Sequence, residues 1–259
     1  MPLLDRLFLA PVLQKLFARA GFYRLDAHLS AAAAQHVHAS LLHSVLDRYS
    51  IDCVLDVGAN QGQFAASLRA NGYRGPIVSF EPVAEPFRAL SAHAASDPNW
   101  HVRPEALGSA DSTRDIHVMR RSEFSSFLAP TPEQPSKSAG RNEILRTESV
   151  SVRRLDSLAR SIPPLDSSRH IFLKLDTQGF DLDVFAGAAA LLPRIDVLQS
   201  ELSMVPIYQD MPHFTDALAQ YDAAGFILCS LVPVVRDPHT LIPIECDCLL
   251  LRRDVLPRK

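Results

Sequence analysis

Basic charge is scarce in this chain of 259 residues. Lys and Arg number 26 against 29 Asp and Glu, which gives a net charge of −3 with neutral His. Proteins that bind nucleic acids usually present a basic surface to the phosphates. We therefore expect no nucleic-acid partner.

The chain also lacks the spacing of metal ligands. Its Cys are few and lie in apolar, strand-like runs, and neither a CxxC nor an HExxH pattern occurs. We interpret these residues as buried thiols in a reducing cytoplasm, the ten His as surface or structural residues, and we predict no metal site. The four cysteines are Cys53, Cys229, Cys246 and Cys248.

Long apolar runs are missing as well. Asp5, Arg6 and Lys15 interrupt the first 21 residues, which therefore lack the apolar centre of a secretory signal, and no stretch is long enough to span a bilayer. We expect a cytoplasmic protein. Apolar residues between Leu3 and Phe17 recur at helical spacing. Such a helix could pack on its own domain or on a partner chain, a second copy included. It could instead lie on a membrane surface. We favour packing on protein over binding to a membrane.

The pattern changes near residue 51. Residues 1–50 read as a helical extension, rich in helix formers over Ala31–Ala34 and Ser40–Tyr49. Residues 51–259 alternate short apolar runs with helical segments, which is typical of a parallel sheet covered by helices. The predicted strands are Cys53–Val57, Ile77–Phe80, His101–Val102, Phe172–Leu175 and Val197–Gln199, and the predicted helices are Pro86–Ala95, Asp181–Leu192 and His213–Ala224.

Two regions depart from this alternation. Strand-like runs at Ile116–Met119 and Val150–Val152 flank Ala129–Gly140, a segment rich in Pro, Ser and Thr that we interpret as a long loop. The chain then ends in two extended runs, Phe226–Val235 and Cys246–Leu251, which predict an antiparallel hairpin.

Polar residues follow the predicted strands, at the edge where ligands bind in open α/β sheets. The first strand leads into the turn Asp56–Gly62, where glycine lets the backbone approach a ligand. Glu81-Pro82 follows the second strand, where a carboxylate suits the two hydroxyls of a ribose. Glu105-Ala106-Leu107 follows the third and is placed to meet an adenine, and Asp176–Gly179 follows the fourth.

The cofactor is a dinucleotide or S-adenosylmethionine. A dinucleotide site needs G-x-G-x-x-G, and the turn with Gly58 and Gly62 lacks that spacing. Asp56 places a carboxylate near the turn, which disfavours phosphates and suits a cationic methionine group. The chemistry favours adenosylmethionine. The cofactor-binding candidates are Asp56, Gly58, Ala59, Asn60, Gly62, Glu81, Pro82, Glu105, Ala106 and Leu107.

With these motifs the chain resembles the FkbM-type methyltransferases, from about Ile51 to the C-terminus. The resemblance implies a Rossmann-like class I fold, with a mainly parallel seven-stranded sheet ending in an antiparallel hairpin, and an enzyme that methylates hydroxyls of sugars or natural products. One motif departs from the family, which usually reads D-V-E-G where this chain has Asp176-Thr177-Gln178-Gly179. Any role that the family gives to that Glu therefore cannot be transferred to Gln178. The motifs that carry the resemblance are Asp56–Gly62, Phe80–Pro82, Glu105–Gly108, Lys174–Asp181 and Glu201-Leu202.

Methyl transfer to a hydroxyl requires alignment of the acceptor oxygen and removal of its proton. Asp176 is the first candidate for the base or orienting group, against the alternative of a helix N-cap, and Glu201 is the second. Ser125, Ser126 and Gln178 are the candidates for acceptor binding.

The predicted function is O-methylation of a hydroxyl, on a small molecule or on a sugar of a glycolipid, polysaccharide or glycosylated natural product. The alternatives are methylation of an amine or a non-sugar hydroxyl, a non-catalytic scaffold with this fold, and a nicotinamide oxidoreductase.

Overall fold

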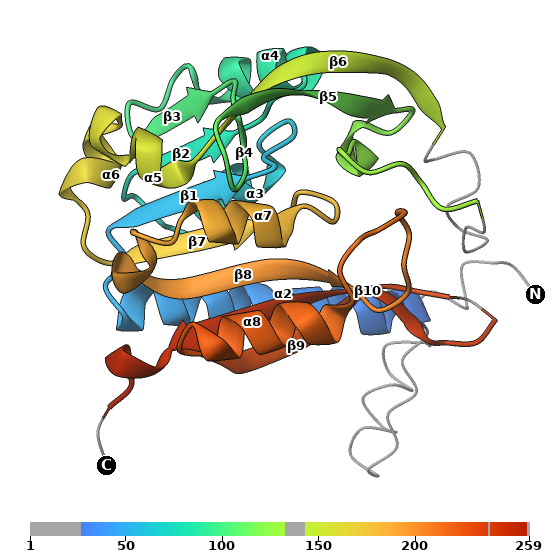
Figure 1. The fold of residues 1–259 in the computed structure, drawn as a ribbon. Coiled ribbons are helices and arrows are strands. Elements are labelled where there is room, and N and C mark those ends of the chain that lie inside the picture. The colour runs from blue at the N-terminus through green and yellow to red at the C-terminus, as the bar shows by residue number, and fades with distance from the viewer. Residues whose placement is uncertain (1–26, 133–142, 238, 258–259) are drawn as a thin grey trace, which may run out of the picture.

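The central sheet has seven strands in the order β3-β2-β1-β7-β8-β10-β9 (Figure 1). It is seen in a computed structural model that describes residues 27–132, 143–237 and 239–257. The first five strands in this order run parallel, and β10 is antiparallel to both β8 and β9. This architecture confirms the predicted fold class. The strands are β1 (Cys53–Val57), β2 (Ile77–Phe80), β3 (Trp100–Arg103), β7 (Ile171–Leu175), β8 (Ile195–Ser203), β9 (Phe226–Arg236) and β10 (Pro243–Arg252).

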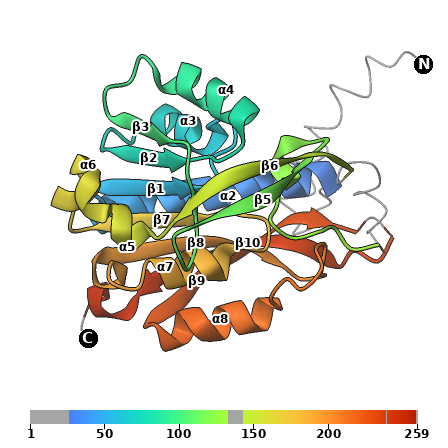
Figure 2. The ribbon, with the colours of Figure 1, turned by 45° about the horizontal axis from the view of Figure 1, so that its top comes forward.

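Helices cover both faces of the sheet, so that every residue of β1, β2 and β7 is buried. On one face α2 (Ala27–Arg48), α3 (Gln63–Ala70) and α4 (Ala84–Ala94) share a core with Val54 and Phe172. On the other face the remaining helices pack on Leu55 and Leu173, and Figure 2 shows α7 and α8 on this side. These helices are α5 (Leu155–Leu158), α6 (Pro163–Ser167), α7 (Asp181–Gly187) and α8 (Phe214–Ala223).

A second sheet of three strands, in the order β4-β6-β5, lies beside the first (Figure 1). It consists of β4 (Ala106–Leu107), β5 (Ser112–Met119) and β6 (Ile144–Arg153), with the short helix η1 (Ser122–Phe124) after β5. The two predicted strand-like runs are confirmed within β5 and β6. The interpretation of Ala129–Gly140 as a loop falls mostly on residues 133–142, outside the described part of the chain.

The helix α2 packs on the domain that follows it. Leu42, Val45 and Leu46 are buried in the same core as Val54 of β1. The helical segments predicted between residues 31 and 49 belong to this single helix. The domain boundary near residue 50 stays a prediction, and the helix predicted between Leu3 and Phe17 lies outside the described residues.

Two predictions are wrong in detail. The helix predicted over Asp181–Leu192 ends at Gly187, where a Cβ atom would lie 2.0 Å from the carbonyl oxygen of Gly108, and Leu192 begins a separate 3-10 turn. Cys229 is exposed on β9, the edge strand of the sheet, whereas the other cysteines are buried and all four are free thiols.

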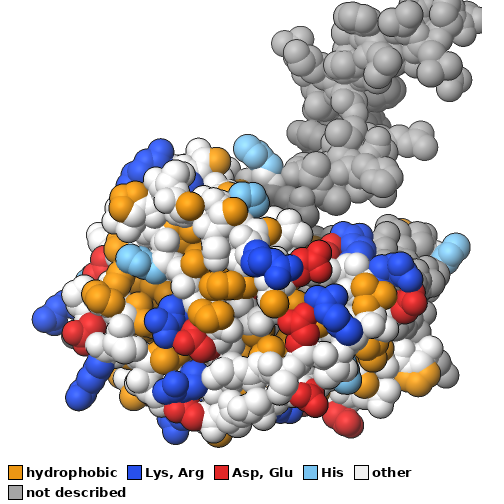
Figure 3. Space-filling model, turned by 90° about the horizontal axis from the view of Figure 1, so that it is seen from above, with side chains coloured by type: hydrophobic (Ala, Val, Ile, Leu, Met, Phe, Trp, Pro, Cys, Tyr) orange, Lys and Arg blue, Asp and Glu red, His pale blue; other side chains and the backbone are white. Residues whose placement is uncertain are grey.

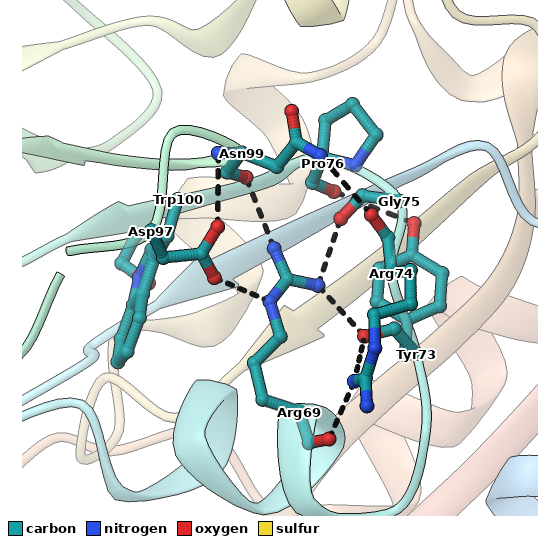
Figure 4. A network of polar contacts seen from close by, with 9 residues as sticks. Arg69, Tyr73, Arg74, Gly75, Pro76, Asp97, Asn99 and Trp100 are labelled. Carbon is teal, nitrogen blue, oxygen red and sulfur yellow. Dashed lines mark hydrogen bonds and ion pairs between the residues drawn. The ribbon is translucent and has the colours of Figure 1, made fainter.

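Arg69 ties together the loops that lead into β2 and β3 (Figure 4). Its guanidinium pairs with Asp97 at 2.6 Å and donates to the carbonyl oxygens of Tyr73 at 3.0 Å, Gly75 at 2.8 Å and Asn99 at 3.1 Å. These loops lie at the amino ends of the strands, opposite the edge where the predicted site residues gather.

In the part of the chain that the structure describes, no helix has both the length and the hydrophobicity to cross a membrane.

Candidate active site

The turn after β1 brings backbone close to two neighbouring strand ends. The amides of Gly58 and Ala59 both donate to the carbonyl oxygen of Phe80, at 3.1 and 3.0 Å. Gly58 has φ +78°, and a Cβ there would lie 1.9 Å from the backbone oxygen of Asp176. Only glycine fits this conformation and this approach, so the turn packs directly against the end of β7.

A cavity of about 320 Å³ opens above this turn, at the carboxyl ends of β1, β2, β7 and β8. It brings together most of the residues predicted from the sequence. Those that line it are Gly58, Ala59, Asn60, Glu81, Pro82, Glu105, Ala106, Leu107, Ser125, Asp176, Gln178 and Glu201.

Three predicted residues do not line the cavity. Gly62 has φ +91° at the start of α3, and its Cβ position faces Trp100 and Leu90 in the core. Ser126 is buried and donates to the carbonyl oxygen of Gln178 at 2.7 Å, so it fixes the backbone of a residue that lines the cavity. Asp56 is fully buried in β1 and reaches the cavity only through its neighbours.

Asp56, Lys174 and Asp176 form a row of ion-paired side chains. Asp56 accepts from the Ser79 hydroxyl at 3.1 Å, and Lys174 Nζ lies 3.2 Å from Asp56 Oδ1 and 3.1 Å from Asp176 Oδ2. The two carboxylates raise the pKa of Lys174 above its ordinary value, against the effect of burial. The Lys174 ammonium also lies 5.2 Å from the ring centre of Phe64. Lys174 therefore couples the buried Asp56 to the carboxylate that faces the cavity.

The ion pairs of Lys174 are not among the sequence predictions, although the sequence holds a signal for them. The chain has four lysines, and Lys174 is the only one that falls inside an apolar run predicted to be a buried strand. A cation there needs carboxylate partners.

Glu81 is the carboxylate that the sequence predicts to bind the ribose. It is 6% exposed and accepts from the amides of Asn60 and Val83, both at 2.8 Å. Burial raises the pKa of Glu81 to about 7, although both backbone hydrogen bonds lower it. Each carboxylate oxygen accepts one backbone hydrogen bond and keeps a further lone pair for a ligand hydroxyl.

Gln178 joins the two predicted catalytic carboxylates. Its Nε2 donates to Asp176 Oδ1 at 3.2 Å and to Glu201 Oε2 at 2.7 Å, while the Tyr208 hydroxyl donates to its Oε1 at 2.8 Å. Gln178 has φ +53°, a conformation that costs energy in a residue with a side chain. Burial, and next the charge of Asp176, raise the pKa of Glu201 well above its ordinary value.

Another part of the cavity wall combines an ion-paired carboxylate with apolar surface. Arg103 binds both oxygens of Glu105, at 3.2 and 2.7 Å, while Ala106 and Leu107 supply apolar surface. The Nδ2 atom of Asn60 is buried without a hydrogen-bond partner in the described structure. Among the described residues, no three His, Cys, Asp or Glu side chains gather in a way that could hold a metal ion.

These residues fit adenosylmethionine. Gly58, Ala59 and Asn60 of the turn line the cavity, Glu81 offers acceptors for ribose hydroxyls, Asn60 offers an unused donor, and Ala106 and Leu107 offer apolar contact to a base. The sequence matches the family described as the methyltransferase FkbM domain over residues 56–228. The chain belongs to this family. It is an S-adenosylmethionine-dependent methyltransferase, which confirms the predicted enzyme class and cofactor and removes the nicotinamide alternative.

Solved structures resemble this FkbM methyltransferase more distantly. Fibrillarin of Aeropyrum pernix, with natively bound S-adenosylmethionine, is 10% identical, with a TM-score of 0.43 over 77% of this chain and 66% of that one. An rRNA methylase of Streptococcus thermophilus is 12% identical, with 0.43 over 84% and 95%. The Burkholderia thailandensis 1,6-didemethyltoxoflavin-N1-methyltransferase is 13% identical, with 0.42 over 97% and 92%. No curated protein matches the sequence.

Proposed function

We propose that this methyltransferase transfers the methyl group to a hydroxyl oxygen, and that the hydroxyl belongs to a sugar in a glycolipid, polysaccharide or glycosylated natural product. One observation carries the proposal: the cavity that holds the cofactor residues also holds Asp176 and Glu201, bridged by the amide of Gln178. Carboxylates and amides at fixed spacing are the groups that bind neighbouring hydroxyls.

The bound cofactor supplies a methyl group on a positively charged sulfur, ready for attack by an oxygen. Asp176 orients the acceptor hydroxyl, because its side chain is 35% exposed at the cavity and is fixed by Lys174 and Gln178. Glu201 in its ionised form accepts the proton, directly or through Asp176, because Gln178 bridges the two carboxylates and the raised pKa of Glu201 makes its carboxylate the stronger base.

The charge distribution supports an acceptor other than a nucleic acid. The net charge is −3. On the face seen in Figure 3, basic side chains are interspersed with acidic ones. Several arginines are paired in this way, as in Arg120–Glu143 and Arg146–Glu148. Such pairing leaves little free positive charge for phosphates.

The first test is titration of the purified protein with S-adenosylhomocysteine by calorimetry. Micromolar binding, worth about 7–9 kcal/mol, is expected. A screen of glycosides and glycolipids for methyl transfer then follows. Transfer to amines alone, or to alcohols without a sugar, would correct the acceptor class.

The proposed roles of the carboxylates are tested with Asp176→Asn. We expect turnover to fall by about a hundredfold or more, because the orienting acceptor is lost, while the affinity for adenosylhomocysteine changes less than about twofold. Asp216→Asn is the matched control, since Asp216 is exposed in the first turn of α8. Full activity of Asp176→Asn on the true acceptor would remove Asp176 from the mechanism.

A further inference from the structure

A second cavity, of about 300 Å³, lies between α2, α3 and the hairpin of β9 and β10. Its walls are mostly apolar, with Leu42 and Leu46 from α2, Leu68 from α3, and Val232 and Pro233 from β9. Polar side chains also line the cavity, among them Ser67 and Asn71 of the α3 region, but apolar surface makes up the larger part of its walls. Their chemistry suits an aliphatic or ring hydrocarbon group.

This cavity adjoins the active-site cavity. Phe64, Gln199, Val234 and Asp247 line both cavities. A molecule that fills the second cavity therefore contacts residues that also line the first cavity, in which Asp176 and Glu201 lie.

Two buried polar side chains that line the second cavity have atoms without a hydrogen-bond partner among the described residues. His38 is 8% exposed, and neither of its ring nitrogens has a hydrogen-bond partner. Gln199 is 5% exposed; its side chain hydrogen-bonds to Asp247, but its Oε1 has no partner. Burial raises the pKa of Asp247, and the nearby His38 opposes this increase. Buried groups of this kind are costly unless a ligand or water satisfies them.

We propose that the second cavity binds the apolar aglycone of the acceptor, with His38 and Gln199 hydrogen-bonding to oxygen or hydroxyl groups where the aglycone meets the sugar. The inference rests on the proposed function and narrows it. The acceptor is a glycoside with a hydrocarbon part, and its reactive hydroxyl lies beside Asp176 and Glu201 while its hydrocarbon part extends between α2 and the hairpin.

The probes are octyl β-D-glucoside, kept below its micelle concentration, and methyl β-D-glucoside. They share the sugar and differ in the hydrocarbon chain. Each is titrated by calorimetry into the protein saturated with S-adenosylhomocysteine. We expect the octyl glycoside to bind at least about tenfold more tightly, because the cavity removes its chain from water.

Three variants test the location. Ala39→Phe fills the cavity and should weaken octyl glucoside binding about tenfold or more, and leave methyl glucoside and adenosylhomocysteine unaffected. Val37→Phe is the control on the same helix, since Val37 is 65% exposed, and should change nothing. His38→Phe should weaken both glycosides about threefold to tenfold, because it removes a hydrogen bond near the sugar.

The outcomes separate the two proposals. If adenosylhomocysteine fails to bind, the proposed function itself is wrong. If it binds but the two glycosides bind equally, or Ala39→Phe and Val37→Phe behave alike, only the assignment of the second cavity is overturned. Tighter glycoside binding by His38→Phe would overturn the role given to His38.

Discussion

Lys174→Met is the variant that tests the charge arrangement beneath the active site. It removes the ammonium between Asp56 and Asp176 and replaces it with an unbranched apolar chain. The Lys174 side chain is 7% exposed and that of Asp56 is 0% exposed, whereas that of Asp176 is 35% exposed. Water can therefore solvate Asp176 in the variant, but Asp56 is left with the Ser79 hydroxyl alone.

We expect the free energy of unfolding to fall by about 3–5 kcal/mol, because removing one partner of a buried ion pair leaves the other charge uncompensated. The pH of the measurement follows from linkage. The folded pKa of Lys174 is raised above its ordinary value of 10.5, so its stabilisation is fully present below that pH and is lost only as the pH rises through the folded pKa. Measurements at pH 8 therefore report the whole effect.

The assay is urea unfolding followed by far-ultraviolet circular dichroism, for the native chain, Lys174→Met, Asp56→Asn and the double variant. The double variant lacks the buried unpaired charge and should recover at least about 2 kcal/mol of the loss. A loss below about 1 kcal/mol in Lys174→Met, or additive losses in the double variant, would refute the reasoning.

Three further predictions concern the cofactor turn and its support. Because the pKa of Glu81 is about 7, the affinity for adenosylhomocysteine should rise about tenfold from pH 6 to pH 8 as the carboxylate ionises. Glu81→Gln should bind adenosylhomocysteine weakly and without this pH dependence. Calorimetry of both proteins at several pH values tests the prediction. Gly58→Ala should lower the free energy of unfolding by at least about 2 kcal/mol and remove most of the cofactor affinity, because the new Cβ would overlap the carbonyl of Asp176 at a positive φ. Thermal unfolding measures the stability and calorimetric titration the affinity. Native-like values of either quantity would contradict the assigned turn. Arg69→Ala should cost about 2–4 kcal/mol in urea unfolding through the loss of its pairing with Asp97 and three carbonyls, yet leave cofactor affinity within about twofold; a strong loss of affinity would show that this network reaches the active site.

Local patterns predicted the central sheet well and the second sheet poorly. β1 and β2 have the predicted bounds because each is a short apolar run bounded by residues typical of turns. The pairing of Ala106–Leu107 with Val152-Arg153 joins segments far apart in the sequence, and no local pattern encodes it. The α7 helix ends early for a similar reason, since the close approach of Gly187 to Gly108 is a tertiary contact.

The role of Asp56 shows how register decides a site. Asp56 is paired in register with Ser79 of β2 on one side and with Lys174 of β7 on the other. All three polar residues thus lie in one row across the sheet, where their side chains interact. The sequence shows each residue at the end of a predicted strand, but strand order and register are needed before Asp56 can be seen as a buried partner of Lys174. Its predicted role in cofactor binding stays a prediction, acting through Lys174.

Gln178 gives a physical account of the departure from the usual D-V-E-G pattern. Burial raises the pKa values of Glu201, Glu245 and Asp247, and the charge of Asp176 raises all three further. A Glu at position 178 would add another carboxylate at 2.7 Å from Glu201, at a point where the amide now donates. The amide converts this repulsion into two hydrogen bonds, and Tyr208 fixes which end of it faces the carboxylates. Gln178 therefore sets the spacing of Asp176 and Glu201 without adding charge to a cavity whose acidic residues already repel one another.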